Sequence, residues 1–274
     1  REKATSNICT AQALLATMAG FYAVYHGPDG IKEIANHVHA VAFWLAEQLT
    51  KLGYKLQNEN FFDTLRIQLP NNVTIQEVRT IALSKEINLR YFDNGDVGIS
   101  VDETTTQADA TLILNLFAVA AEEPMHDVCA IPGKAPVAAQ FQRLSTYLTH
   151  EVFQKYHTET EMMRYIKRLE RKDISLAHSM ISLGSCTMKL NAASEMLPLS
   201  NAAWMNLHPL VPEDQAAGYQ TLIHNLSEQL KTITGFAGVS LQPNSGAAGE
   251  YTGLRVIRSY QESIGQGNRR LVLI

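Results

Sequence analysis

Residues 239–258, VSLQPNSGAAGEYTGLRVIR, change from a short apolar run to a series of tiny residues and then to a helical pattern. The run 239–242 predicts the end of a β-strand, which Pro243 stops. The small residues 244–249 leave room for backbone N–H groups to approach a ligand. From Glu250 the apolar residues follow helical spacing, so free N–H groups and the positive end of the helix dipole would face an anion. The stretch predicts a strand, an anion-binding loop and a helix, although tight packing explains the same small residues and no nucleotide-binding fingerprint is present.

The size and composition of the chain restrict the classes of protein to which it can belong. With 274 residues, 46% hydrophobic and 18% charged, it is long enough for one large domain or two moderate ones. The net charge of −4 argues against nucleic acid or an anionic membrane as a partner, since either favours a concentrated basic face. No apolar run approaches the ~20 residues that span a bilayer, and no signal peptide is recognisable. We therefore expect a small-molecule ligand and a cytoplasmic location, or an organelle matrix in a eukaryote.

The cysteines and histidines indicate neither a disulfide framework nor a metal site. Cys9, Cys129 and Cys186 are odd in number, far apart and without C-x-x-C spacing, so each is expected to be a small buried hydrophobe. His37 and His39 would suit a metal pair on a strand, but they lie in a helical pattern, where such neighbours face different directions. We expect solvated or helix-capping histidines and no bound metal.

The first part of the chain has the pattern of a small α+β lobe that follows a long helix. The predicted helices are 5–26, 31–51, 74–84 and 106–121, and the predicted strands are 61–69, 87–92 and 97–101. Strong turn residues at 27–30 separate the first two helices, and Thr74 with Glu77 forms a capping box. Strands and helices in this order predict one sheet covered by helices.

A linker separates this lobe from the rest of the chain. Residues 122–139 are rich in proline and glycine, which cannot continue a helix, and they lack a strand pattern. A charged amphipathic helix is predicted over 159–173, and a longer helix over 215–234 ends at Gly235. The chain opens without methionine and closes on an apolar strand pattern at 271–274, so we expect a piece of a longer protein.

Residues 180–196, MISLGSCTMKLNAASEM, form a second unusual segment. The run Ser185, Cys186 and Thr187 places two hydroxyls and a thiol together, a composition that suits the lining of a polar pocket. A nucleophilic cysteine would need a histidine partner, which the sequence alone does not identify. A plain loop with a helix cap at Ser185 or Thr187 explains the same residues.

Several long motifs resemble the glycine cleavage system P-protein family. SMISLGSCTMKLN, WMNLHPLVPEDQAAGYQ and LQPNSGAAGEYTGLRVIR are similar to the C-terminal half of these proteins. REKATSNICTAQALLATMAGFYAVYHGPDG, FFDTLRIQLP and INLRYFDNGDVGISVDETTT are similar to the end of the N-terminal half. The resemblance covers nearly the whole chain in order, so it implies an internal fragment that spans the junction of two homologous halves.

The resemblance implies an α/β fold, the pyridoxal phosphate (PLP)-dependent transferase fold type I, with the two halves packed as a pseudo-dimer. On this basis residues 1–122 are the small C-terminal lobe of a non-catalytic half and 123–149 are a linker. Residues 150–274 are then the N-terminal arm and the beginning of the PLP-binding large domain of the catalytic half. The lysine that binds the cofactor covalently lies beyond Ile274 in this family, and Lys189 does not match it. No catalytic residue is therefore expected in these residues, which would be inactive alone.

The activity that the resemblance implies is a PLP-dependent oxidative decarboxylation of glycine. The family releases CO2 and passes the remaining aminomethyl group to lipoamide on the H-protein, in a system with T- and L-proteins. Backbone N–H groups of Ser245, Gly246 and Ala247, with the Ser245 hydroxyl, would hold the cofactor phosphate. Ser185, Cys186 and Thr187 would line the substrate pocket. A homodimer or a pseudo-dimer of halves is the expected assembly.

Two departures and two alternatives remain open at this point. Ala248 stands where many relatives are expected to carry glutamine, which removes one side-chain contact but keeps a backbone-based grip. Arg90 resembles the arginine that binds the substrate carboxylate in other fold-type-I enzymes, but we expect a structural ion pair.

Another PLP enzyme of the same fold, such as a cysteine desulfurase or an amino-acid decarboxylase, is one alternative function. A non-catalytic assembly scaffold, whose small lobe docks against the catalytic half, is the other. Light scattering would discriminate, because a severed α/β sheet should expose apolar edges and self-associate.

Overall fold

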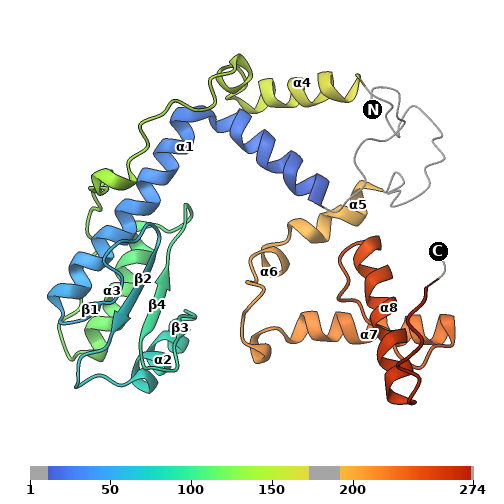
Figure 1. Cartoon of the computed structure of the whole chain (residues 1–274). Coiled ribbons are helices and arrows are strands. Elements are labelled where there is room, and N and C mark those ends of the chain that lie inside the picture. The colour runs from blue at the N-terminus through green and yellow to red at the C-terminus, as the bar shows by residue number, and fades with distance from the viewer. Residues whose placement is uncertain (1–11, 173–191, 273–274) are drawn as a thin grey trace. The chain divides into compact units, whose positions relative to one another are not determined.

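The computed structural model describes residues 12–172 and 192–272, which fold into helices and one small antiparallel sheet (Figure 1). The chain divides into two compact units. One unit is Tyr22–Met163, and the other combines Arg1–Phe21 with Arg164–Ile274. Helix α1 (Gln12–Lys51) begins in the second of these and continues into the first.

Helix α1 has a sharp kink where the sequence predicted a separation of two helices. Gly27 has φ 64° and ψ −177°, a conformation that is essentially restricted to glycine, and Pro28 follows it. The residues after Pro28 are already helical, so the predicted separation into two helical segments is confirmed, with the turn shortened to a kink at Gly27. The proline explains this outcome, because it is well tolerated at the start of a helical segment but cannot donate a backbone hydrogen bond within one.

The sheet of the Tyr22–Met163 unit has four short strands in the order β1-β2-β4-β3, and all neighbours are antiparallel. The strands are β1 (Lys55–Leu56), β2 (Thr64–Gln68), β3 (Arg90–Tyr91) and β4 (Val97–Ser100). Leu65 and Ile67 of β2 are buried, whereas Thr64 and Gln68 are exposed. This alternation means that one face of the sheet packs on the core and the other is polar.

Three helices supply the rest of this core. Side chains of α1, α2 (Ile75–Ser84) and α3 (Gln107–Ala120) join those of the sheet in a single cluster. Fully buried members include Leu45 and Leu49 of α1, Val78 of α2 and Phe117 of α3. The predicted helices and the capping box of α2 are confirmed, and α3 has a second capping box. The predicted strand 87–92 is shorter than expected, because only Arg90 and Tyr91 pair with β4.

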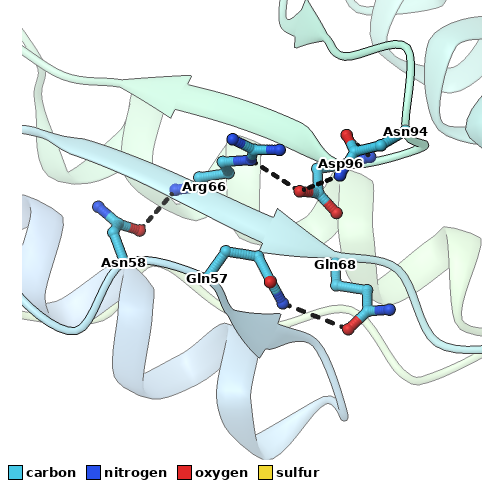
Figure 2. Close-up of polar contacts among 6 residues, drawn as sticks. All are labelled: Gln57, Asn58, Arg66, Gln68, Asn94 and Asp96. Atoms are coloured by element: carbon cyan, nitrogen blue, oxygen red, sulfur yellow. Dashed lines mark hydrogen bonds and ion pairs between the residues drawn. The ribbon is translucent and has the colours of Figure 1, made fainter.

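The polar face of the sheet is organised around one ion pair (Figure 2). The Nε atom of Arg66 lies 2.7 Å from Oδ2 of Asp96, and the same carboxylate accepts a 2.9 Å hydrogen bond from the Asn94 amide. Gln57 donates to Gln68 on this face at 3.2 Å. These polar groups satisfy one another, which allows the face to remain without a covering layer.

The predicted linker returns along α1 instead of leading away from the lobe (Figure 1). His39 lies 3.1 Å from the carbonyl oxygen of Pro136, and the Tyr147 hydroxyl donates a 2.6 Å hydrogen bond to the carbonyl of Pro28. Beyond the linker, Nδ1 of His157 donates to the carbonyl of Tyr25 at 2.7 Å. The segment contains two short 3₁₀ helices, η1 (Ala139–Phe141) and η2 (Glu151–Gln154), and precedes α4 (Glu159–Glu170).

The remaining described elements belong to the C-terminal part of the chain. They are α5 (Ala193–Met196), η3 (Leu197–Ser200), α6 (Ala202–Met205), η4 (Glu213–Gln215), α7 (Ala217–Thr234) and α8 (Gly246–Ser263). Helix α7 ends at Gly235, which has the left-handed conformation (φ 73°), as the sequence predicted. The Tyr219 hydroxyl donates to the carbonyl of Trp204 at 2.8 Å and links α7 to α6. No side chain of α7 or α8 is buried in the described part of the chain.

One strand prediction in this part is wrong, and a second is tested only at its first two residues. Residues 239–242 are irregular, and residues 271–272 also lack strand pairing, while 273–274 lie outside the described residues. A strand is defined by a hydrogen-bonded neighbour, and every strand that the structure describes in residues 12–172 and 192–272 belongs to the four-stranded sheet of the other unit. The two apolar runs therefore have no described partner for pairing.

Candidate functional site

The predicted anion-binding loop is the start of helix α8, which begins earlier than the sequence indicated. The helix starts at Gly246 instead of near Glu250, and Ser245 is its N-cap in an extended conformation (φ −157°, ψ 164°). The Ser245 hydroxyl accepts a 3.2 Å hydrogen bond from the backbone N–H of Ala248. The carbonyl of Ser245 accepts the first intrahelical bond, from the N–H of Gly249 at 2.9 Å. The small residues thus form the first helical turn instead of a loop before it.

The cap leaves two N–H groups available at the end of the helix. Gly246 and Ala247 occupy the first two helical positions, whose N–H groups have no acceptor inside a helix. Both residues are exposed, and no hydrogen bond from either N–H appears within the described residues. Together with the positive end of the helix dipole, these groups are suited to an anion such as a phosphate.

The charge at this site comes from the backbone. The cationic side chains of α8 lie further along the helix, and Arg258 is engaged there: its Nε lies 2.8 Å from Glu262, and its Nη1 donates to the carbonyl of Gly267 at 2.9 Å. Ala248 contributes a methyl group and uses its N–H for the cap. The Ser245 hydroxyl accepts from Ala248, so its own proton remains available for donation to a ligand.

The second predicted group of site residues lies outside the described residues. Ser185, Cys186 and Thr187 fall within 173–191, so their relation to the α8 terminus stays a prediction. In the described part of the chain after this segment, Nδ1 of His208 accepts a 3.0 Å hydrogen bond from the N–H of Leu210. This bond holds the His208 ring against the turn at residues 209–210.

The structural ion pair expected for Arg90 is wrong. No ion pair of Arg90 occurs within the described parts of the chain, and its guanidinium instead lies 5.6 Å from the centre of the Phe92 ring. The ion pair of this sheet belongs to Arg66, which occupies the equivalent position two strands away, since both Arg66 and Arg90 pair with Gly98. Gly98 leaves the space between them that the Phe92 ring and the Arg90 side chain occupy.

Two further predictions about single residues need correction. His39 is neither solvated nor a cap: its side chain is buried, and it lies between the carbonyls of Phe62 and Pro136. Cys129 is exposed in the linker instead of buried. His37 is exposed, and its Nε2 lies 3.2 Å from the carbonyl oxygen of Thr105. Within residues 12–172 and 192–272, no three histidine, cysteine or acidic side chains come together as metal ligands.

Sequence reasoning missed a groove of about 1390 Å³ between α1, the loop before β2 and the returning linker. Its walls include the aromatic rings of Phe43, Phe61 and Phe141, and the charged side chains Lys32, Glu59 and Arg143 also line it. Nothing in the sequence indicated this groove, because it is formed by segments about 100 residues apart. A search of the described helices for a membrane-spanning segment found none.

Comparison with known proteins gives a consistent result along the chain. Residues 1–117 match the family model for the glycine cleavage system P-protein. All 274 residues align with proteins named glycine dehydrogenase (decarboxylating), at 69% identity in Bacteroides fragilis strain YCH46 and 67% in Bacteroides thetaiotaomicron. A putative mitochondrial glycine dehydrogenase (decarboxylating) of Schizosaccharomyces pombe is 49% identical over 295 aligned residues.

The chain spans only about 29% of the length of the Bacteroides relatives and 28% of the Schizosaccharomyces pombe relative. The alignment nevertheless includes 100% of this chain in each case, so the described lobe, the linker and the α8 terminus all lie within the matched region. The chain is thus similar over residues 1–117 to the glycine cleavage system P-protein family, and over all 274 residues to proteins named glycine dehydrogenase (decarboxylating).

Proposed function

We propose that the chain is part of a PLP-dependent glycine dehydrogenase of the glycine cleavage system. The enzyme would release CO2 from glycine and transfer the remaining aminomethyl group to lipoamide of the H-protein. The observation that carries this proposal is the 69% identity, over all 274 residues, to a protein named glycine dehydrogenase (decarboxylating). Because the chain spans about 29% of that protein, the activity is proposed for the longer polypeptide.

The residues at the α8 terminus fit the phosphate group of PLP. Gly246 and Ala247 would donate their N–H groups, and Ser245 would donate its hydroxyl proton while it keeps the helix capped. When bound, the cofactor supplies the electron sink that decarboxylation of an amino acid needs. The protein part described here would hold and orient that cofactor through its phosphate, and Ser185, Cys186 and Thr187 would line the substrate pocket.

The wider arrangement follows from the same proposal. Residues 1–122 would be the small lobe of a non-catalytic half, 123–149 a linker, and 150–274 the arm and the start of a PLP-binding large domain of fold type I. The T- and L-proteins would act in the same system, and the assembly would be a homodimer or a pseudo-dimer of halves. Bacterial relatives support a cytoplasmic location, and the name of the Schizosaccharomyces pombe relative supports a mitochondrial matrix in eukaryotes.

The activity is tested with the full-length protein. We expect carboxyl-labelled glycine to release labelled CO2 only when PLP and lipoylated H-protein are both present. Release of labelled CO2 without H-protein, or turnover of cysteine or a larger amino acid in place of glycine, would indicate a different PLP enzyme. No turnover of any amino acid by a folded, PLP-loaded protein would favour an assembly role.

The phosphate site is tested by two substitutions that separate capping from ligand binding. Ser245→Asp keeps an excellent N-cap but places a negative charge beside the phosphate, whereas Ser245→Ala removes the cap. We expect Ser245→Asp to weaken PLP binding by about tenfold or more, with no loss of thermal stability. Its affinity for pyridoxal, which lacks the phosphate, should stay unchanged.

Ser263→Ala is the matched control, because Ser263 lies at the other end of α8 and donates to the Tyr260 carbonyl. This control should bind PLP as the wild type does. Equal PLP affinity of Ser245→Asp and the wild type would show that the α8 terminus does not hold the phosphate.

A further inference from the structure

His39 occupies an unusual position between two backbone segments that are far apart in the sequence. Its ring is buried, with 6% of the residue exposed. Nδ1 lies 3.0 Å from the carbonyl oxygen of Phe62, and Nε2 lies 3.1 Å from the carbonyl oxygen of Pro136. A carbonyl oxygen only accepts hydrogen bonds, and a neutral imidazole has only one N–H. Both contacts can therefore be hydrogen bonds only when the ring is an imidazolium.

Three aromatic rings surround His39. The ring centres of Phe43, Phe61 and Phe62 lie 6.2, 6.0 and 5.8 Å from that of His39, and the Phe62 ring is parallel to it within 1°. Aromatic faces attract a cation, and the attraction is stronger where water is excluded. Of the three rings, Phe62 presents its face to the imidazole, whose two nitrogens lie against two carbonyl oxygens.

We propose that His39 is a protonation-dependent clamp that attaches the linker to the lobe. The imidazolium donates one hydrogen bond to the lobe at Phe62 and one to the linker at Pro136. Loss of one proton leaves a ring nitrogen lone pair facing a carbonyl oxygen, and two acceptors in contact repel each other. The linker around Pro136 then separates from α1, and the groove beside it opens.

Charged side chains from each surrounding element lie near this ring. Lys32 on α1, Glu59 in the loop before β2 and Arg143 on the linker line the groove that His39 borders. Among the residues that the structure describes, the two hydrogen-bond partners of His39 are both backbone carbonyls. Both contacts therefore require an N–H donor from the His39 ring. A side chain with one donor or none cannot make both hydrogen bonds.

The opening would be confined to one part of the linker. Tyr147 and His157 attach the following segment to the kink of α1, and each makes a single hydrogen bond to one carbonyl, of Pro28 and Tyr25 respectively. A single donor serves a single acceptor, so neutral imidazole satisfies the His157 contact. Deprotonation should release residues near Pro136 while these two anchors hold.

Trypsin cleavage after Lys134 and Arg143 of the full chain reports the state of the linker. Each rate is divided by the rate of trypsin on a fluorogenic peptide at the same pH, which removes the pH dependence of the protease. We expect the corrected rate to rise about tenfold between pH 6 and pH 8 in the wild type, the effect of losing roughly one buried hydrogen bond. His39→Phe should give the high rate at both pH values, and His37→Gln, an exposed neighbour with one carbonyl contact, should behave as the wild type.

Nitrogen NMR of the wild-type His39 ring provides a measurement that needs no variant. A doubly protonated ring at the pH where cleavage is slow, and a neutral ring where it is fast, would support the clamp. A neutral ring throughout, or a corrected cleavage rate that is the same at pH 6 and pH 8, would overturn it.

Discussion

The hydroxyl of Tyr54 donates a 2.7 Å hydrogen bond to the backbone carbonyl of Phe117. The two residues are 63 positions apart and both are fully buried, and their rings meet edge to face with centres 5.2 Å apart. This contact connects the turn after α1 to the last turn of α3. Burial raises the pKa of the Tyr54 phenol well above its usual range.

Removal of this hydroxyl should measurably destabilise the lobe. We expect Tyr54→Phe to lower the free energy of unfolding by about 1 kcal/mol, because the Phe117 carbonyl keeps only its bond from the Ala121 N–H. Tyr91→Phe is the matched control, since Tyr91 is half-buried and stacks against Arg79. Urea unfolding at pH 7 checks both variants, and equal stabilities of Tyr54→Phe and the wild type would contradict the prediction.

The same tyrosine should make stability depend on alkaline pH. A phenol with a raised pKa in the folded state keeps its proton where the unfolded chain has lost it. Its stabilisation is therefore complete below the ordinary pKa of about 10 and is lost as pH rises above it. The difference in stability between the wild type and Tyr54→Phe should shrink between pH 9 and about pH 11. A constant difference over this range would argue against a buried phenol.

Asp96 should contribute stability that acid removes. The hydrogen bond from Asn94, followed by those from Arg66 and its charge, lowers the pKa of the Asp96 carboxyl, against the effect of burial. Because the pKa of Asp96 is lowered in the folded protein, its stabilisation is complete above the ordinary aspartate pKa of about 3.9. The stabilisation is lost as the pH falls through the pKa of the folded state. We expect Asp96→Ala to cost about 2 kcal/mol at pH 7 and progressively less below pH 4, measured by urea unfolding.

Glu151 offers a matched comparison for Asp96, since its ion pair with Lys155 lies on the surface. Glu151→Gln should leave the unfolding curve unchanged at pH 7. A loss for Glu151→Gln as large as that for Asp96→Ala would show that burial is not what distinguishes the two carboxylates.

Gly27 should be irreplaceable, whereas Gly20 in the same helix should not. A Cβ at Gly27 would lie 2.7 Å from the Phe153 carbonyl oxygen and 2.8 Å from Cε1 of His157, in a backbone conformation that other residues avoid. We expect Gly27→Ala to cost about 2 kcal/mol and to make the segment around His157 more sensitive to protease. Gly20→Ala meets no atom within 4 Å and should raise stability by up to about 1 kcal/mol. Equal thermal shifts for the two variants would refute the role of the kink.

The capping box of α3 should carry most of the local stability at its start. Thr106 accepts from the Asp109 N–H at 3.2 Å, and Asp109 accepts from the Thr106 N–H at 2.8 Å, so each satisfies a group of the other. Thr106→Ala should cost about 1 kcal/mol, while Thr106→Ser should restore most of it. Thr80→Ala, in the interior of α2, should be neutral or stabilising, because alanine is the better helix former. Calorimetry that ranks Thr80→Ala below Thr106→Ala would contradict this order.

Local patterns were sufficient for most of the helices. Apolar spacing, together with Thr74 and Glu77 at one end of α2 and Gly235 after α7, predicted where these helices begin or end, and the structure confirms them. Strands were predicted less well: 61–69 and 97–101 are confirmed in shorter form, whereas 239–242 is irregular. The difference arises because a helix satisfies its backbone internally, but a strand needs a partner from elsewhere in the chain.

The candidate phosphate site was also predicted from the sequence only where it depends on neighbouring residues. The sequence predicted Ser245, Gly246 and Ala247 from composition and from a family resemblance, and the structure adds that Ser245 is the N-cap and that helix α8 starts four residues earlier than expected. Ser185, Cys186 and Thr187 stay a prediction, since they lie outside the described residues. The α8 terminus itself depends only on neighbouring residues, which is why a pattern of small residues could locate it.

The sequence by itself determined the order of the helices, their caps and the position of the α1 kink, because each of these depends on residues within a few positions of one another. Only the tertiary structure decided that His39 is buried between Phe62 and Pro136, that Arg66 and not Arg90 holds the ion pair with Asp96, and that the linker returns along α1. These contacts join segments from about 20 to 100 residues apart, and their energy depends on burial and on partners that no local pattern specifies.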